Sequence, residues 1–569
     1  MRSIARLFAR VLPLMFAVFC GSALSIAAHA QSVAFDWFEY TGRDKVFDAP
    51  LAAGQYRNPI LAGFYPDPSI TRAGDKFYLV NSTFSYFPGI PVLESTDLVH
   101  WKLVSHAIDR PSQLNFDGLG MSRGVFAPAI EFHDGVFYVI NTAVDSGGNF
   151  FVTATNPAGP WSDPQWLPQI DGIDPSFFFD DDGKAYVLNN GPPEGKPLYE
   201  GHRAIWIQEF NVATRKLVGP RKVIINGGVN LADKPIWIEG PHLYKRDGWY
   251  YLMCAEGGTE INHSEVIFRS RSPWGPFEPY AGNPILTQRD LSPTRANPVI
   301  NAGHADMVEA PDGSWWAVFL ASRAYGKGEY NTGRETFLLP VTWKDGWPVI
   351  LEKGKPIPYV NQGPKFMSSG SKAPQVLQAP MSGNFTWRDE FDGESLKPEW
   401  LQARVPKQQW FDLRSKPGSL VIRALPVSLH DQTNLSYLGR RQQHTAFDAS
   451  TQLEIPPAGV AAGLVAFQNQ NYWYFLGVRR EAQGVQLFLQ KAAGKDTEVI
   501  AQQQLNSGST VKLKIAGDGG DYGFFYDADG KGWRALTEHV DGSILSTAIA
   551  GGFIGATVGP FARSERPVQ

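Results

Sequence analysis

The chain has 569 residues, of which 13% are aromatic and 19% charged, and its formal net charge is −4 at pH 7. This length exceeds what one hydrophobic core usually supports, so we expect two domains. The mildly acidic balance and the lack of a long basic run exclude a typical nucleic-acid-binding protein and favour a neutral partner.

The first 30 residues have the features of an export signal. Three arginines lie among the first ten residues, an apolar stretch covers 12–19, and Ala28-His29-Ala30 offers a cleavage site. The apolar stretch contains Pro13 and is too short to span a bilayer. We therefore expect residues 1–30 to be removed from an exported protein, periplasmic or extracellular, with no membrane span. The mature chain keeps Cys254 alone, which precludes an internal disulfide.

One sequence unit recurs five times before residue 320. Each copy contains a polar turn with a glycine, followed by an aromatic-rich apolar strand. The copies of this turn and strand are 74–80, 134–140, 182–188, 247–253 and 312–318. Their glycines lie 48 to 65 residues apart, which leaves room for about four short strands per unit, the size of a propeller blade. The sequence therefore predicts an all-β protein with a five-bladed β-propeller over residues 31–360.

Each unit also has a shared element seven to nine residues before its turn glycine. In four units this element carries an ionisable side chain, Asp67, Asp174, Glu239 or His304, and in the remaining unit it carries Ala127. The innermost strands of a propeller line its axis, so equivalent positions in successive blades lie close together. We expect the four ionisable side chains to share one pocket.

Three carboxylates in one pocket suit the hydrolysis of a glycosidic bond, which needs a base on one side of the sugar and an acid on the other. We expect Asp67, bracketed by prolines, to be the base, the longer Glu239 to be the acid, and Asp174 to tune the pKa of the acid. Each residue alone could simply cap a turn, but turn capping gives no reason for acids to recur at one blade position. A competing interpretation is a channel site in which His304 and waters hold Ca²⁺, although no cofactor is expected to be required.

Residues 57–350 resemble glycoside hydrolase family 43, the inverting five-bladed enzymes that act on xylan and arabinan. The resemblance rests on the segments 58–69, 172–176 and 239–242, and it implies the same three catalytic roles for Asp67, Asp174 and Glu239. Three further segments are most similar to the β-xylosidase branch, whose members often also cleave arabinofuranosides. These segments are 82–89, 255–259 and 333–336.

The same resemblance implies which residues bind the terminal sugar, namely Phe84, Phe126, Thr259, His304 and Arg334. Phe126 stands where that branch usually has Trp, which changes the stacking contact. The aromatic residues could equally belong to an ordinary core. The implied activity is release of terminal xylose or arabinose from plant cell-wall oligosaccharide, and the number of subunits is left open.

A second domain is expected after the propeller. Residues 361–383 are rich in Pro, Ser and Gly and predict a linker. Short apolar strands such as 463–467 and the alternating segment 511–515 follow. They predict a β-sandwich over residues 384–569, similar to the concanavalin-like or laminin-G-like sandwich that accompanies β-xylosidases of this family. It could bind carbohydrate, or brace the propeller and lend a loop to the pocket rim, and we favour bracing.

Two other functions stay open on the sequence alone. A retaining five-bladed fructan hydrolase would use one aspartate as a nucleophile. Such enzymes surround this residue with an Asn-Asp-Pro-Asn-type segment, whereas Asp67 lies in Tyr-Pro-Asp-Pro-Ser. A carbohydrate-binding propeller without catalysis would need the aromatic residues and Arg334 but not three acids. The anomer of the product tests the first alternative, and a Glu239→Gln variant tests the second.

Overall fold

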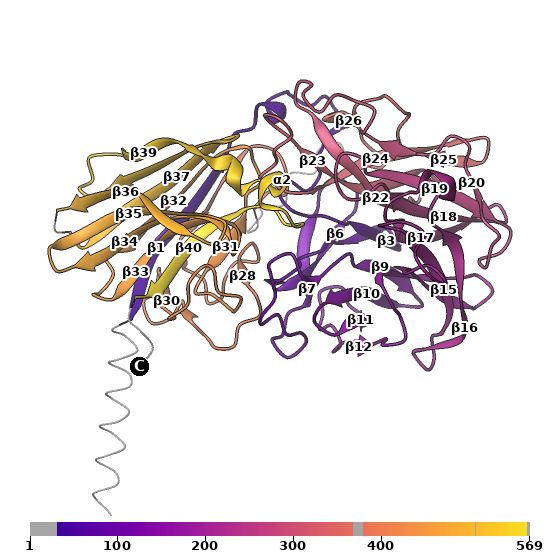
Figure 1. Cartoon of the computed structure of the whole chain (residues 1–569), viewed down its shortest axis with the longest axis horizontal. Helices are drawn as coiled ribbons and strands as arrows, with labels where there is room; N and C mark the ends of the chain where they lie inside the picture. The colour runs from indigo at the N-terminus through magenta and orange to yellow at the C-terminus, as the bar shows by residue number, and fades with distance from the viewer. Residues whose placement is uncertain (1–30, 368–378, 507, 566–569) are drawn as a thin grey trace, which may run out of the picture.

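A computed structural model describes residues 31–367, 379–506 and 508–565, and Figure 1 shows two β-rich bodies side by side. The expected export signal, 1–30, and the segment 368–378 of the expected linker lie outside the described residues. Helical structure in the described ranges is limited to α2 (Thr547–Ala550) and three short 3-10 turns. The all-β prediction is therefore confirmed. No helix among these residues is long and apolar enough to cross a membrane.

The first body is a propeller of five antiparallel sheets, and each blade has four main strands. The first two blades consist of β3 (Ser69–Ala73), β4 (Lys76–Val80), β6 (Gly89–Ser95) and β7 (Lys102–Ile108), then β9 (Ala129–His133), β10 (Val136–Val144), β11 (Gly148–Ala154) and β12 (Gln165–Trp166). The third consists of β13 (Ile173–Phe179), β14 (Ala185–Gly191), β15 (Ala204–Asn211) and β16 (Lys216–Asn226). The last two consist of β17 (Glu239–Arg246), β18 (Trp249–Glu256), β19 (Ser264–Ser270) and β20 (Glu278–Pro279), then β22 (Val299–Glu309), β23 (Trp315–Arg323), β24 (Glu335–Lys344) and β25 (Trp347–Val349).

The five predicted turns join the first and second strands of the blades. Their glycines, at positions 74, 135, 183, 248 and 313, all have φ between 67° and 85°, a region that glycine enters without steric cost. The first strand of each blade thus runs from one face of the propeller to the turn on the other face, and the loop between the second and third strands returns to the starting face. We call this starting face the upper face.

The ring of blades closes through non-local contacts. β2 (Gln55–Arg57) pairs with β26 (Val360–Gln362), which joins the segments before the first blade and after the last. At the axis, Ser69 of the first blade donates a hydrogen bond of 2.7 Å to Asp306 of the fifth blade. The blades therefore form one closed body rather than an open array.

The second body is a sandwich of two antiparallel sheets packed over a shared apolar core. The first sheet has the order β29 (Phe411–Asp412), β30 (Leu420–Arg423), β1 (Ser32–Gly42), β32 (Ala446–Glu454), β37 (Thr510–Asp518), β38 (Asp521–Asp527) and β39 (Arg534–Asp541), with β27 (Phe385–Asp389) paired to β1. The second has the order β36 (Thr497–Leu505), β35 (Gly484–Ala493), β34 (Tyr472–Glu481), β33 (Val460–Asn469), β40 (Thr557–Ser564), β31 (Leu438–Arg441), β28 (Leu401–Ala403) and β5 (Tyr86–Phe87).

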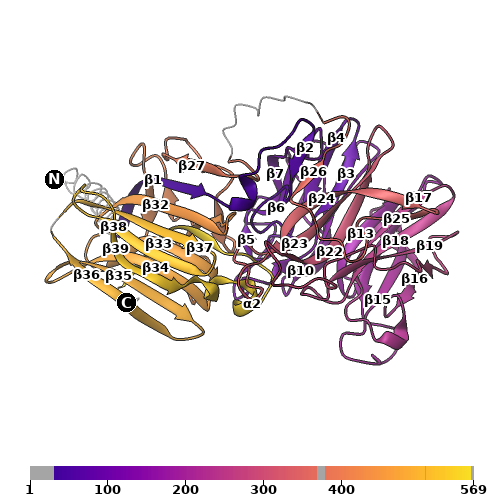
Figure 2. The same cartoon turned by 90° about the horizontal axis from the view of Figure 1, so that it is seen from above.

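The N-terminal strand does not belong to the domain in which we expected it. We expected the propeller to begin at residue 31, but β1 lies inside the first sandwich sheet, between β30 and β32. Figure 2 shows β1 in indigo among the orange and yellow strands of the sandwich. Alternation buries Phe38 and Tyr40 in the sandwich core, and a register shift after Phe35 lets that residue point into the same core. Alternation predicts a half-buried strand without saying which sheet it joins.

The two bodies share a strand and a buried ionic network. β5, from the first blade's upper loop, pairs with β28 at the edge of the second sandwich sheet. Arg323 of the fifth blade bridges Asp44, Glu335 and the carbonyl oxygen of Gln443. All of these charged side chains are at most 3% exposed, so the contact between the two bodies includes buried charged groups as well as the shared strand.

Candidate active site

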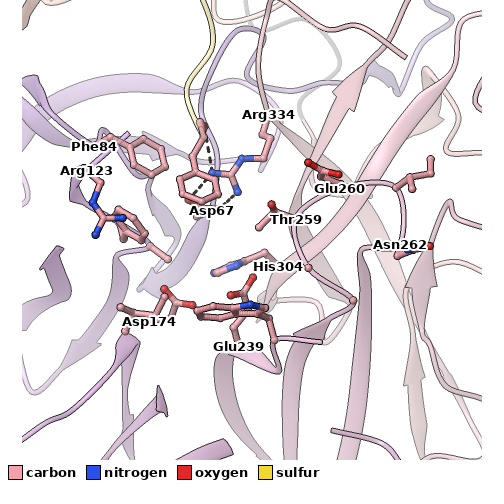
Figure 3. A pocket seen from close by; sticks show the side chains of 18 residues that line it. Asp67, Phe84, Arg123, Asp174, Glu239, Thr259, Glu260, Asn262, His304 and Arg334 are labelled. Carbon is pink, nitrogen blue, oxygen red and sulfur yellow. Dashed lines mark hydrogen bonds and ion pairs between the residues drawn. The ribbon is translucent and has the colours of Figure 1, made fainter. Parts of the chain in front are cut away.

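A cavity of about 510 Å³ opens on the upper face of the propeller. The residues that line it come from the starts of first strands, from the loops between second and third strands, and from the sandwich. They are Asp67, Phe84, Arg123, Phe126, Ala127, Ile173, Asp174, Trp237, Glu239, Gly257, Gly258, Thr259, Glu260, Ile261, Asn262, His304, Arg334 and Phe553. All eight side chains that the sequence singled out are among them, and Figure 3 labels seven of these, all except Phe126, around one space.

Local backbone distortions aim these side chains at the axis. Asp67, Asp174 and His304 have φ of 50° to 52°, and Gly240, next to Glu239, has φ of 56°. The strands that carry Asp174, Gly240 and His304 also show register shifts at these positions. Bulges with left-handed residues re-aim a side chain near an active site. The proline that follows Asp67, Asp174 or Gly240 suits a bulge because it cannot donate to the ladder.

Asp67 is held in its ionised form. Nη1 of Arg334 donates a hydrogen bond of 2.8 Å to Oδ1 of Asp67, and the hydroxyl of Ser82 donates one of 2.5 Å to Oδ2. Burial acts to raise the pKa of Asp67, but the charge of Arg334 and the Ser82 bond hold it below its usual value. Asp67 can therefore accept a proton from a water molecule at neutral pH.

Asp174 and Glu239 lie on the other side of the pocket from Asp67 (Figure 3). Burial, followed by the negative charge of Asp67, raises the pKa of Asp174 to about 7. Burial, then the charges of Asp174 and Asp67, raises the pKa of Glu239 well above its usual value. Of the three carboxyl groups, Glu239 therefore favours its protonated form and is the one suited to donate a proton. Carboxyl groups whose pKa values are pushed apart form an acid and base pair.

His304 lies across the floor of the pocket as a neutral ring. Burial lowers its pKa to about 4, and its ring packs so closely on Gly240 that an added Cβ would lie 2.9 Å from Nε2. The nearby carboxylate Asp306 already accepts bonds from Ser69 and Tyr244. Among the described residues, no group of three or more His, Cys, Asp and Glu side chains is arranged to hold a metal ion.

Three phenylalanines form one wall of the pocket. The ring of Phe84 lies 5.4 Å from Phe126 and 5.9 Å from Phe553, measured between centroids. Phe553 comes from the sandwich, just after α2, and its carbonyl oxygen accepts a bond of 3.3 Å from Arg334. The sandwich thus contributes a loop to the pocket, as we expected. The sequence could not single out Phe553, because no local pattern places a residue of one domain in the cavity of another.

The opposite wall belongs to the fourth blade. Trp237 lines the cavity next to the loop that carries Thr259 and Glu260. The guanidinium carbon of Arg203 lies 4.1 Å above the Trp237 ring, and its positive charge partly offsets the raised pKa of Glu239. Arg203 is therefore a second cation near the carboxylates, and sequence reasoning missed it because its blade position carries no repeated motif.

Comparison with known proteins finds matches for both bodies of the chain. Residues 56–348 match the family described as glycosyl hydrolases family 43, and residues 388–568 match the β-xylosidase C-terminal concanavalin A-like domain. A xylosidase/arabinosidase of Butyrivibrio fibrisolvens is 40% identical over 89% of this chain and 96% of its own length. A non-reducing end α-L-arabinofuranosidase of Bacteroides ovatus, BoGH43B, is 38% identical over 90% of this chain and 92% of its own. The crystal structure of a GH43_12 retrieved from a capybara gut metagenome is 41% identical, with a TM-score of 0.88, and the match covers 94% of this chain and 100% of that one.

Proposed function

Since the chain belongs to glycosyl hydrolases family 43 and is a xylosidase- or arabinofuranosidase-like hydrolase, we propose that it releases terminal xylose or arabinose from plant cell-wall oligosaccharides with inversion at the anomeric carbon. The observation that carries this proposal is that Asp67, Asp174 and Glu239 line one cavity, where Arg334 donates a hydrogen bond to Asp67 but burial and neighbouring carboxylates raise the pKa of Glu239. The names of the relatives support pentoses as the sugars released, because these relatives are a xylosidase/arabinosidase and an α-L-arabinofuranosidase.

Asp67 acts as the general base. Its carboxylate removes a proton from a water molecule, and the oxygen of that water attacks the anomeric carbon of the terminal sugar. Arg334 and Ser82 fix the carboxylate by three hydrogen bonds, so little reorganisation is needed when the water approaches. Because the same bonds lower the basicity of Asp67, positioning rather than intrinsic base strength supplies most of its effect.

Glu239 acts as the general acid. It donates its proton to the glycosidic oxygen while the bond between that oxygen and the anomeric carbon breaks, so the leaving group departs as a neutral alcohol. The carboxylate of Asp174 opposes ionisation of Glu239 and so keeps the proton on it. His304, neutral at working pH, and Arg334 are placed to hydrogen-bond the hydroxyls of the terminal sugar.

The protein is further proposed to act outside the cytoplasm as an exported enzyme with a brace-like sandwich and no required metal. The support is the signal-like segment 1–30, the strand β5 shared between the bodies, and, among the described residues, the absence of a group of three or more His, Cys, Asp and Glu side chains that could hold a metal ion. N-terminal sequencing of the secreted protein tests the first point, with Gln31 as the expected first residue.

The substrate assignment is tested by rates on aryl β-xyloside, aryl α-arabinofuranoside and linear arabinan, each with and without a chelator. We expect cleavage of one or both aryl pentosides, little cleavage of linear arabinan, and rates that the chelator leaves unchanged. Failure to cleave either aryl pentoside would contradict the proposed function, and loss of rate in the chelator would contradict metal independence.

A further inference from the structure

The outermost strand of the second blade carries an exposed tryptophan. Trp166, on the outermost strand β12, is 42% exposed. It pairs with Phe150 of β11, and the two ring centroids lie 5.2 Å apart. The hairpin tip between β10 and β11 lies on the upper face, where the first strands of all blades begin. Trp166 therefore belongs to the same face of the propeller as the catalytic cavity.

Gly147 allows the indole to lie against the hairpin tip. An added Cβ at Gly147 would lie 2.4 Å from the Trp166 ring, so only glycine permits this contact. The ring thus rests on Gly147 and Phe150 while much of its surface stays open to solvent. A flat aromatic surface supported from below and open above is the form that stacks on the apolar face of a sugar.

A continuous set of contacts joins this ring to the pocket. Arg123, which lines the cavity, lies 5.7 Å from the centre of the Phe126 ring. Its Nε donates a bond of 2.6 Å to Asp145, at the start of the same hairpin tip. The side chains of Arg123 and Asp145 are 42% and 56% exposed. From the axis outward, the surface therefore offers an aromatic wall, a polar pair for hydroxyl groups, and then the Trp166 ring.

From this arrangement we infer that Trp166 forms a distal subsite on the leaving-group side of the substrate. It binds a sugar unit of the leaving group that lies beyond the first sugar after the scissile bond. This inference rests on the proposed function. A terminal sugar occupies the cavity, so the rest of the oligosaccharide must leave through its mouth. The Arg123 and Asp145 pair provides donors and acceptors along the route, and the indole provides the stacking surface.

The test compares kcat/KM on xylohexaose with kcat/KM on aryl β-xyloside, whose aglycone is too short to reach the indole. Trp166→Ala should lower the ratio of the two values roughly 3- to 10-fold. Trp533→Ala is the matched control, because Trp533 is 41% exposed on the sandwich, and it should leave the ratio unchanged. An unchanged ratio in Trp166→Ala, or an equal fall in Trp533→Ala, would overturn the inference.

A second pair of variants separates stacking from loss of the fold. Gly147→Ala should lower the same ratio because the new Cβ displaces the indole, whereas Gly148→Ala should not, since Gly148 also has a positive φ but no atom within 4 Å of an added Cβ. Equal ratios in these two variants would contradict the subsite. If the wild type cleaves neither of these xylosides, calorimetric binding of xylohexaose to wild type and Trp166→Ala tests the subsite alone, and the proposed function fails only if aryl α-arabinofuranoside is also left intact. Weaker binding by the variant supports it, and equal binding overturns it.

Discussion

Arg334 and Asp67 form a buried ion pair at the bottom of the pocket, with 2.8 Å between Nη1 and Oδ1 and at most 5% of either side chain exposed. The pair connects the catalytic pocket to the interface between the two bodies. Glu335, the next residue after Arg334, accepts a bond of 2.7 Å from the amide of Gly63, in the segment that leads to Asp67. Glu335 in turn binds Arg323 of the interface network. The sandwich thus supports the geometry of the proposed base.

The loss of rate on replacing the proposed acid should depend on the leaving group of the substrate. Glu239→Gln removes the proton donor, so kcat on xylo-oligosaccharides, whose leaving group needs protonation, should fall about 10²- to 10⁴-fold. The fall on p-nitrophenyl β-xyloside should be much smaller, because nitrophenolate leaves without a proton. Asp67→Asn is the matched comparison and should lower both rates alike, because water activation is needed for every substrate. A Glu239→Gln variant that loses both rates equally would contradict the assignment.

The pH profile of kcat/KM should have two limbs of opposite origin. Asp67 must be ionised, and its pKa lies below the usual value, so activity should persist in mild acid and fall only at lower pH. Glu239 must be protonated, and its pKa is raised, so activity should fall as the pH rises through that value. In Asp174→Asn the loss of a negative neighbour should move the alkaline limb to lower pH. An unmoved limb would argue against Asp174 as the pKa modulator.

Asp174 should also destabilise the folded protein at high pH. Its pKa is about 7 in the folded protein and near 3.8 when exposed, so the folded state favours the protonated form. The corresponding stability is present below pH 4 and is lost as the pH rises through about 7. The melting temperature of Asp174→Asn relative to wild type should therefore increase from pH 4 to pH 8. Asp75→Asn, at an exposed turn, is the control, and an equal trend there would contradict this cause.

Breaking the interface network should destabilise the protein and impair catalysis together. Glu335→Gln leaves the buried Arg323 guanidinium with less negative charge, and removing one partner of a buried ion pair costs about 3 to 5 kcal/mol. Because Glu335 also binds Gly63, kcat should fall even where the variant is folded. Glu352→Gln is the matched control, since its pair with Lys344 is exposed and should contribute little. Equal unfolding midpoints of these two variants would contradict a structural role for the network.

The sequence predicted the repeated parts of the molecule well and the non-local parts poorly. The recurring turn placed Asp67, Asp174, Glu239 and His304 in equivalent blade positions, because a repeat encodes its own geometry. The membership of β1 in the sandwich could not be predicted, because alternation fixes the faces of a strand but not its neighbours. Phe553 was missed for a related reason, because it reaches the pocket through the packing of a distant segment. Arg203 was missed because its blade position carries no repeated motif.

The stereochemistry of hydrolysis tests the central claim most directly, because separate base and acid residues on opposite sides of the sugar require a single displacement by water. Proton NMR of the first minutes of reaction should show α-xylose appearing from an aryl β-xyloside, or β-arabinose from an aryl α-arabinofuranoside, before mutarotation mixes the anomers. First appearance of the anomer that matches the substrate would mean a covalent intermediate, and would contradict the roles proposed for Asp67 and Glu239.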